Sequence, residues 1–267
     1  MCYDSNYWKD ETCVKKSTVN ESCSSENECL EEFECQGNAC QCPIFTHWNG
    51  NSCAFPTECA DIDSPSDGVY KIYSDGHIRP IPVYCEMYGK EKWTVFQRRM
   101  DGTQDFYKSW NDYKTGFGDA NSEYWLGNDI IHRLTNANDH ELRIEIEDYS
   151  GNKAWAEYST FSIGNAASKY ILTIRGYSGT TGDSLGSFSG QTFKTKDYEK
   201  NCPEACSGAW WYQCNIRYGY HHYCPTVSNL NGNYGSTGSG TGIFWYKWNN
   251  DFKSLKKVSM MLKRKVG

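Results

Sequence analysis

The sequence predicts two parts, a small disulfide-rich module and a larger domain built on an antiparallel sheet with short helices. Two observations support this prediction. Residues 1–59 hold nine of the fourteen cysteines and few aliphatic side chains, too few to bury a core without cross-links. From Asp61 onward, cysteines are sparse and short segments of alternating apolar residues appear. We therefore expect a cysteine-rich module over residues 1–58 and the larger domain over 59–267.

The composition favours a secreted, extracellular protein. The fourteen cysteines are an even number and suit an oxidising compartment, because cytosolic thiols are kept reduced. The glycosylation sequon Asn20-Glu21-Ser22 agrees with secretion. A net charge of -6 disfavours nucleic-acid binding, which needs a basic surface to displace counterions. No apolar run reaches the roughly eighteen residues of a membrane span, so we expect none.

The N-terminal cysteines follow a regular spacing. From Cys23 they read C-x5-C-x5-C-x4-C-x-C-x10-C, which resembles an epidermal-growth-factor-like domain. Six cysteines allow fifteen connectivities, so the pairing is taken from the resemblance. It implies the disulfides Cys23–Cys35, Cys29–Cys40 and Cys42–Cys53, and leaves Cys2 to pair with Cys13. Zinc is not expected, because no C-x2-C knuckles are present and His47 stands alone.

Period-two alternation predicts the strands of the larger domain. We expect them over 68–73, 81–85, 93–99, 143–147, 153–161 and 170–174, and at the end, where Val258, Met260 and Leu262 alternate. The lysines of that last strand would face solvent; a basic patch for an acidic partner is the alternative. Short helices are expected over 106–113 and 130–134, the second capped by Asn128 or Asp129. A Cys59–Cys85 bridge would tie the entrance of the domain to its first sheet.

Several motifs occur in an order that resembles a fibrinogen-related domain over about residues 57–265. They include W-T-V-F-Q-R-R-x-D-G from Trp93, E-Y-W-L-G-N-D-I-I-H from Glu123, G-A-W-W-Y from Gly208 and S-N-L-N-G-x-Y from Ser228. Ficolins, tachylectins, angiopoietins and the tenascin C-terminus share this domain. The resemblance implies an α+β fold: a fibrinogen C-terminal-like domain with an antiparallel sheet and a loop-rich ligand subdomain. It also implies a ligand pocket and usually a calcium site.

The calcium site of the family is reduced in this chain. Calcium prefers several hard oxygen ligands, and the resemblance implies a run of alternating aspartates shortly before the position of Cys202. The chain reads TFKTKDYEKNC there and is several residues shorter. We therefore expect no metal and no other cofactor, and Asp197 and Glu199 are the calcium candidates that remain.

The acetyl-group pocket of the family's lectins is also eroded. The resemblance implies a pocket of tyrosines, a tryptophan and a histidine beside a cysteine. The corresponding positions of this chain are Cys206, Cys224-Pro225, Ser239, Gly240 and Asp251. Too few of the usual contacts remain for this chain to bind acetylated sugars through them.

An insertion stands where these contacts are lost. The resemblance implies Cys202–Cys224 as the last family bridge, which leaves Cys206–Cys214; the alternative is Cys202–Cys214 with Cys206–Cys224. Either pairing would tether residues 215–223. Aromatic rings there could stack on sugars, and an arginine could hold a carboxylate; the alternative is that half of the aromatics cover the sheet. The ligand-binding candidates are Tyr212, Arg217, Tyr218, Tyr220, His221, His222, Tyr223 and Ser239. Trp210 and Trp211 are expected to cover the sheet.

These patterns favour a binding protein. No G-x-S-x-G, no H-E-x-x-H and no nucleophile with an identifiable base occur, so we expect no enzyme activity. The leading hypothesis is a secreted, lectin-like protein of innate immunity that binds a glycan or another microbial or cell-surface ligand. The alternative is a protein-binding ligand or matrix component that uses the same face. A homo-oligomer would have to form through domain surfaces, because no collagen-like or heptad segment is present.

Overall fold

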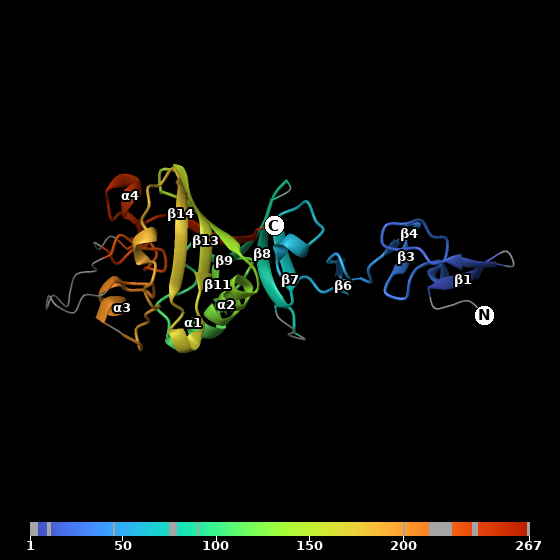
Figure 1. The fold of residues 1–267 in the computed structure, drawn as a ribbon. Helices are drawn as coiled ribbons and strands as arrows, with labels where there is room; N and C mark the ends of the chain where they lie inside the picture. The colour runs from blue at the N-terminus through green and yellow to red at the C-terminus, as the bar shows by residue number, and fades with distance from the viewer. Residues whose placement is uncertain are drawn as a thin grey trace.

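The computed structural model describes residues 5–9, 12–44, 46–74, 79–89, 91–199, 201–213, 226–236 and 240–265. Figure 1 shows a small, extended N-terminal part joined to a larger body. Each part buries its own cluster of apolar side chains. Within the described ranges, no helix is long and apolar enough to span a membrane.

The N-terminal part consists of three small antiparallel hairpins held by disulfides. The strand pairs are β1 (Asn6–Lys9) with β2 (Thr12–Lys15), β3 (Glu34–Gln36) with β4 (Ala39–Gln41), and β5 (His47–Trp48) with β6 (Cys53–Ala54). The bridges are Cys23–Cys35, Cys29–Cys40 and Cys42–Cys53, the pairs that the resemblance implies. Cys13 is also disulfide-bonded; its expected partner, Cys2, lies outside the described residues.

The larger body is organised around a nine-stranded antiparallel sheet. Its strands are β7 (Gly68–Ile72), β8 (Ile81–Tyr88), β9 (Glu91–Arg99), β10 (Phe117–Gly118), β11 (Tyr124–Trp125), β12 (His140–Glu147), β13 (Lys153–Ile163), β14 (Leu172–Gly179) and β17 (Lys257–Arg264). The last strand, β17, lies between β9 and β12. All seven predicted strands exist, although several bounds differ.

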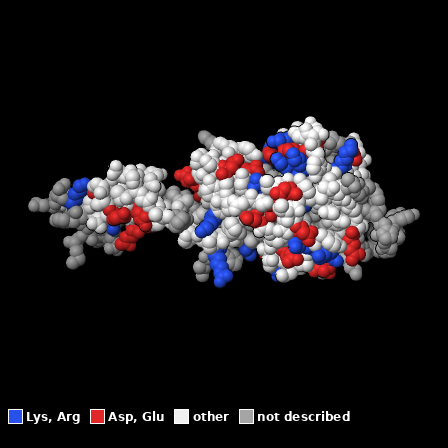
Figure 2. Space-filling view, turned by 180° about the vertical axis from the view of Figure 1, so that it is seen from behind, with Lys and Arg blue, Asp and Glu red and all other residues white. Residues whose placement is uncertain are grey.

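The strand at the end of the sequence follows the predicted alternation, and its lysines are paired. Val258, Met260 and Leu262 are buried. Lys263 lies 3.0 Å from Glu91 on β9 and 3.1 Å from Glu141 on β12. Basic and acidic side chains are also interspersed on the face of the molecule shown in Figure 2.

Both predicted helices exist, but their starts were wrong. Helix α1 (Trp110–Thr115) begins after Ser109, because Ser109 and Asp112 bond each other's backbone amides in a capping box. Helix α2 (Asn128–Ala137) follows Gly127 and has no side-chain cap. Asn128 instead accepts a hydrogen bond from the Trp125 indole at 3.1 Å. Because the helix already begins at Asn128, Gly127 holds the N-cap position, and neither Asn128 nor Asp129 caps the helix as predicted.

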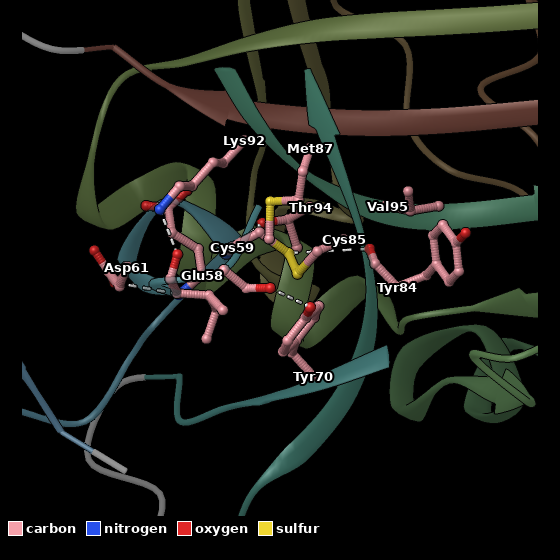
Figure 3. The surroundings of a disulfide bond; sticks show 12 residues. Glu58, Cys59, Asp61, Tyr70, Tyr84, Cys85, Met87, Lys92, Thr94 and Val95 are labelled. Atoms are coloured by element: carbon pink, nitrogen blue, oxygen red, sulfur yellow. Dashed lines mark hydrogen bonds between the residues drawn. A yellow bond between two sulfur atoms is a disulfide. The ribbon is translucent and has the colours of Figure 1, made fainter. Parts of the chain in front are cut away.

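The entrance to the larger body is cross-linked by Cys59–Cys85 (Figure 3). Cys85 lies on β8, and the Cys59 amide donates to the Thr94 hydroxyl on β9 at 2.9 Å. A bridge that closes a loop of this length contributes about 3–4 kcal/mol if its effect is to restrict the unfolded state. The bridge therefore fixes the first turn of the domain, η2 (Cys59–Asp61), onto the sheet.

The rest of the body is a loop-rich region with short elements. These are η3 (Ala166–Ser168), η4 (Gly186–Phe188), α3 (Asn201–Cys206), β15 (Ser228–Asn229), β16 (Phe244–Trp245) and α4 (Tyr246–Asn249). Figure 1 places α3 and α4 at the end of the molecule away from the N-terminal part. The resemblance assigns ligand binding to a loop-rich region of this kind.

Candidate functional site

Two adjacent tryptophans form the floor of the loop-rich region. Trp210 and Trp211 are fully buried. The Trp211 indole donates to the Tyr170 carbonyl at 2.8 Å, and its ring packs against Phe193 with centroids 5.0 Å apart. The prediction that both rings cover the sheet is confirmed, so neither is available to a ligand.

Tyr212 continues the same aromatic core, which corrects its assignment as a ligand residue. Its side chain is only 1% exposed, and burial raises the pKa of its hydroxyl well above the usual value. A ring this deeply buried cannot stack on a sugar. Sequence composition did not distinguish it from the exposed aromatics, because its burial arises from tertiary packing; Tyr107 and Tyr113, which are far away in the sequence, lie near its hydroxyl.

The remaining candidates of the insertion lie outside the described residues. Cys202 and Cys206 are both disulfide-bonded, while Cys214 and Cys224 lie outside the described ranges, so the choice between the two pairings stays a prediction. The ligand-binding candidates Arg217, Tyr218, Tyr220, His221, His222, Tyr223 and Ser239 also lie outside the described residues, so their role stays a prediction.

The calcium candidates do not form a calcium site. One Asp197 carboxylate oxygen accepts from the Trp110 amide and from the Thr195 hydroxyl, both at 2.8 Å. Glu199 is engaged by Lys169 at 3.0 Å and lies 3.6 Å from Lys194. Among the described residues, no third carboxylate joins these two. Because donors of the protein itself already occupy the carboxylates, the donor set does not fit a calcium ion.

A groove of about 630 Å³ lies among the loops of the larger body. We call it the C-terminal groove. Its walls are formed by Asp148–Ser150, by Gly235–Ser236, and by Trp248 with Asp251–Leu255. It includes Asp251, the position at which the resemblance places the pocket tryptophan of the lectins. The groove residue Ser236 is close in sequence to the ligand-binding candidate Ser239.

The C-terminal groove has exposed aromatic surface and several polar side chains. Tyr149 is 55% exposed at its rim, and its ring meets that of Tyr234 edge to face, with centroids 6.5 Å apart. The Ser254 hydroxyl is buried and has no hydrogen-bond partner among the described residues. Asp251 and Lys253 form an ion pair at 2.9 Å, and this hydrogen bond lowers the pKa of Asp251. The groove therefore offers aromatic rings and polar side chains, and its charged residues are Asp148, Asp251 and Lys253.

A second hollow, of about 450 Å³, is lined in part by Gly232, Asn233 and Tyr234, which directly precede the groove residues Gly235 and Ser236. Gly232 to Tyr234 form one side of it and the 101–107 turn forms the other. The Tyr234 hydroxyl donates to the Met100 carbonyl at 3.0 Å. Gly102 has φ +78°, and a Cβ there would lie 2.7 Å from the Tyr234 ring. The close approach of the Tyr234 ring therefore requires glycine at position 102. The 232–236 turn lies between the two hollows.

Sequence reasoning missed Tyr149, Trp248 and Ser254 as groove residues. None belongs to a motif, and Tyr149 lies on a turn that is far in sequence from the turn of Trp248 and Ser254. The only available signal was the resemblance itself, which pointed to Asp251 within the same wall. The sheet brings the turns together, because β12 and β17 pair side by side and two of the turns adjoin their ends.

Comparisons with known proteins agree with this architecture. A family model described as the C-terminal globular domain of fibrinogen beta and gamma chains matches residues 55–265. Fibrinogen-like protein A of Apostichopus parvimensis is 41% identical over 226 residues, covering 79% of this chain and 76% of that protein. Human microfibril-associated glycoprotein 4 is 42% identical over 228 residues, covering 78% and 85%.

A solved structure gives the same result. The fibrinogen-like globe domain of human ANGPTL6 superposes with a TM-score of 0.71 at 31% sequence identity, covering 80% of this chain and 97% of that one. The fold of the larger body is therefore shared with that domain. With a cysteine-rich, disulfide-bonded region before it, the larger body belongs to the family of the C-terminal globular domain of fibrinogen beta and gamma chains.

Proposed function

We propose that this chain is a secreted recognition protein whose fibrinogen-like domain, residues 59–267, binds its ligand at the C-terminal groove. The observation that carries the proposal is one hollow lined by an exposed ring, Tyr149, and by two further aromatic residues, Trp248 and Phe252. The module over residues 1–58 would act as a stalk or a second contact.

The ligand class that the groove supports best is a neutral glycan. Sugar rings present apolar faces that stack on aromatic side chains, and hydroxyls that bond serine and carboxylate oxygens. The groove offers Tyr149, Trp248 and Phe252 for the first kind of contact and Ser150 and Asp251 for the second. Its size falls in the range typical of small-ligand sites. Because the Asp251–Lys253 pair compensates its own charge, no charged sugar is required. Recognition of microbial glycans in innate defence is the setting we infer.

A protein ligand in the extracellular matrix is the second candidate. The similar human protein is named as microfibril-associated, and the acetyl-group contacts implied by the family are absent at Cys206 and Asp251. A protein contact would use the same rim, since tyrosine gives large contact area at low entropic cost. We infer a binding role rather than catalysis in both cases.

A glycan array and a matrix-protein binding assay test the proposal. The wild-type protein, a Tyr149→Ala variant and a Tyr88→Ala variant would be compared. Tyr88 is the matched control, because it is a similarly exposed tyrosine (47%) on β8, outside the groove. We expect binding to fall about tenfold for Tyr149→Ala, the loss of roughly one stacking contact, and to be unchanged for Tyr88→Ala. Absence of any glycan binding by the wild-type protein would leave the matrix-protein hypothesis, and equal binding by all three proteins would move the site elsewhere.

A further inference from the structure

Lys194 is a lysine whose side chain is almost entirely buried, with 6% of the residue exposed. Its ammonium group donates to the Tyr212 carbonyl at 2.9 Å, to the Thr192 hydroxyl at 3.2 Å and to the Thr192 carbonyl at 3.3 Å. Two carbonyls and a hydroxyl thus surround one positive charge. This is the kind of oxygen environment that a hard metal cation takes in proteins.

A carboxylate supplies the counter-charge. Glu199 lies 3.6 Å from the Lys194 ammonium and 3.0 Å from that of Lys169. Burial lowers the pKa of Lys194, and the charge of Glu199 opposes that shift. Burial alone would raise the pKa of Glu199, but the hydrogen bond from Lys169 and the charge of Lys194 outweigh it and hold it low. A buried ammonium with these partners is stable where an isolated one is not.

Hydrogen bonds to neighbouring segments hold the turn that contains Lys194. The backbones of Lys194 and Trp210 exchange two hydrogen bonds, and so do those of Thr195 and Tyr198. Asp197 accepts from the first amide of α1. The segment 192–199 therefore joins α1 to Trp210–Tyr212, the residues that lead into the insertion.

We propose that the Lys194 ammonium takes the structural role of the family's calcium ion, so that this protein holds segment 192–199 against Tyr212 without a metal. The location supports this inference. The segment is the one in which the resemblance implies calcium, it lacks the aspartate run, and the carboxylates it retains bind lysines or cap a helix. The inference does not depend on the identity of the ligand, because it concerns segment 192–199 rather than the C-terminal groove.

Thermal unfolding of the full protein tests the inference. The wild-type protein would be treated with EDTA and then measured with and without millimolar calcium chloride. We expect the same midpoint in both conditions and no calcium binding in a calorimetric titration. A calcium-dependent rise of the midpoint, by more than about 2 °C, would overturn the proposal, since RT ln(1 + [L]/Kd) must appear if the folded protein binds the ion.

Two lysine variants test the role of the ammonium itself. Lys194→Met leaves the Tyr212 and Thr192 oxygens without their donor, and we expect the midpoint to fall by roughly 4–8 °C. Lys169→Met is the matched control, because it removes the more exposed partner of the same Glu199; we expect a fall of no more than about 2 °C. Equal midpoints for the two variants would contradict the proposal. If Lys194→Met does not fold, the wild-type calcium titration decides the matter alone.

Discussion

The two parts of the molecule hold their folds by different means. The N-terminal part buries Cys23, Cys29, Phe33 and Cys40, so cross-links take the place of an apolar core. The larger body buries a continuous aromatic core that includes Trp93, Trp125 and Trp211. The comparison shows that cysteine spacing determines the structure of the first part, whereas packing between distant segments determines the second. The predictions below test this difference.

The largest effect is expected from removing one disulfide in each part. Replacing Cys29 and Cys40 by serine should unfold the N-terminal part, because a lost bridge costs about 2–5 kcal/mol in a small domain. The same change at Cys59 and Cys85 should lower the stability of the larger body but leave it folded, since its core remains. Limited proteolysis and urea unfolding measure both. A larger body that unfolds with the first change would contradict the comparison.

A tryptophan truncation in each part sharpens the contrast. Trp211→Ala should destabilise the larger body by about 3–5 kcal/mol, the usual cost of a cavity left by a large buried ring. Trp48→Ala in the N-terminal part should cost about 1 kcal/mol, because that ring is partly exposed and contacts Phe33 with centroids 5.3 Å apart. Denaturant unfolding gives both values. Equal costs would mean that the N-terminal part also depends on its aromatic packing.

The junction between the parts gives a pH-dependent effect of intermediate size. Asp61 contacts Arg264 on β17 and lies 3.5 Å from His47 of the N-terminal part. Burial alone would raise the pKa of Asp61, but the hydrogen bonds from Arg264 and Thr57 outweigh it and hold the pKa below its ordinary value.

A carboxyl with a depressed folded pKa contributes stability above its unfolded value and loses it as pH falls. The wild-type protein should therefore exceed Asp61→Asn in stability by roughly 1–2 kcal/mol at pH 7. That difference should shrink as pH falls below about 4, the unfolded pKa of an aspartate, and should disappear only below the depressed folded pKa. Urea unfolding at a series of pH values measures it, and a difference that persists in acid would rule out the charge as its cause.

The smallest effect is expected at a carboxylate on β8. Burial and the nearby charge of Glu145 raise the pKa of Glu86, against hydrogen bonds from Tyr88 and Ser259. A carboxyl with a raised folded pKa costs stability when it is charged, and the cost disappears as pH falls through that pKa. Glu86→Gln should therefore raise stability at pH 7 by about 0.5 kcal/mol and have less effect at pH 4. A loss at pH 7 would show that the charged form is favoured there.

Much of the fold could be predicted because its determinants are local. Alternation predicted β12 and β17, and the resemblance implied Cys23–Cys35 and Cys42–Cys53. Helix starts were less predictable, because Gly127 holds the N-cap position of α2 and Asn128, an expected cap, already lies in the helix. The site was predicted least well. Tyr212 was expected to face a ligand but lies in the core, and no local pattern marked the groove residues Tyr149 and Ser254, which meet only through the folded sheet.

The position of β17 has a consequence for how this protein is made. The strand that closes the centre of the sheet, between β9 and β12, is synthesised after all eight of the others. Until Lys257–Arg264 leaves the ribosome, the two halves of the sheet present unpaired edges that can associate with other proteins. The disulfide-bonded N-terminal part can fold meanwhile from local contacts alone. A premature stop before Lys257 should therefore yield an aggregation-prone product with an intact first module and a divided sheet.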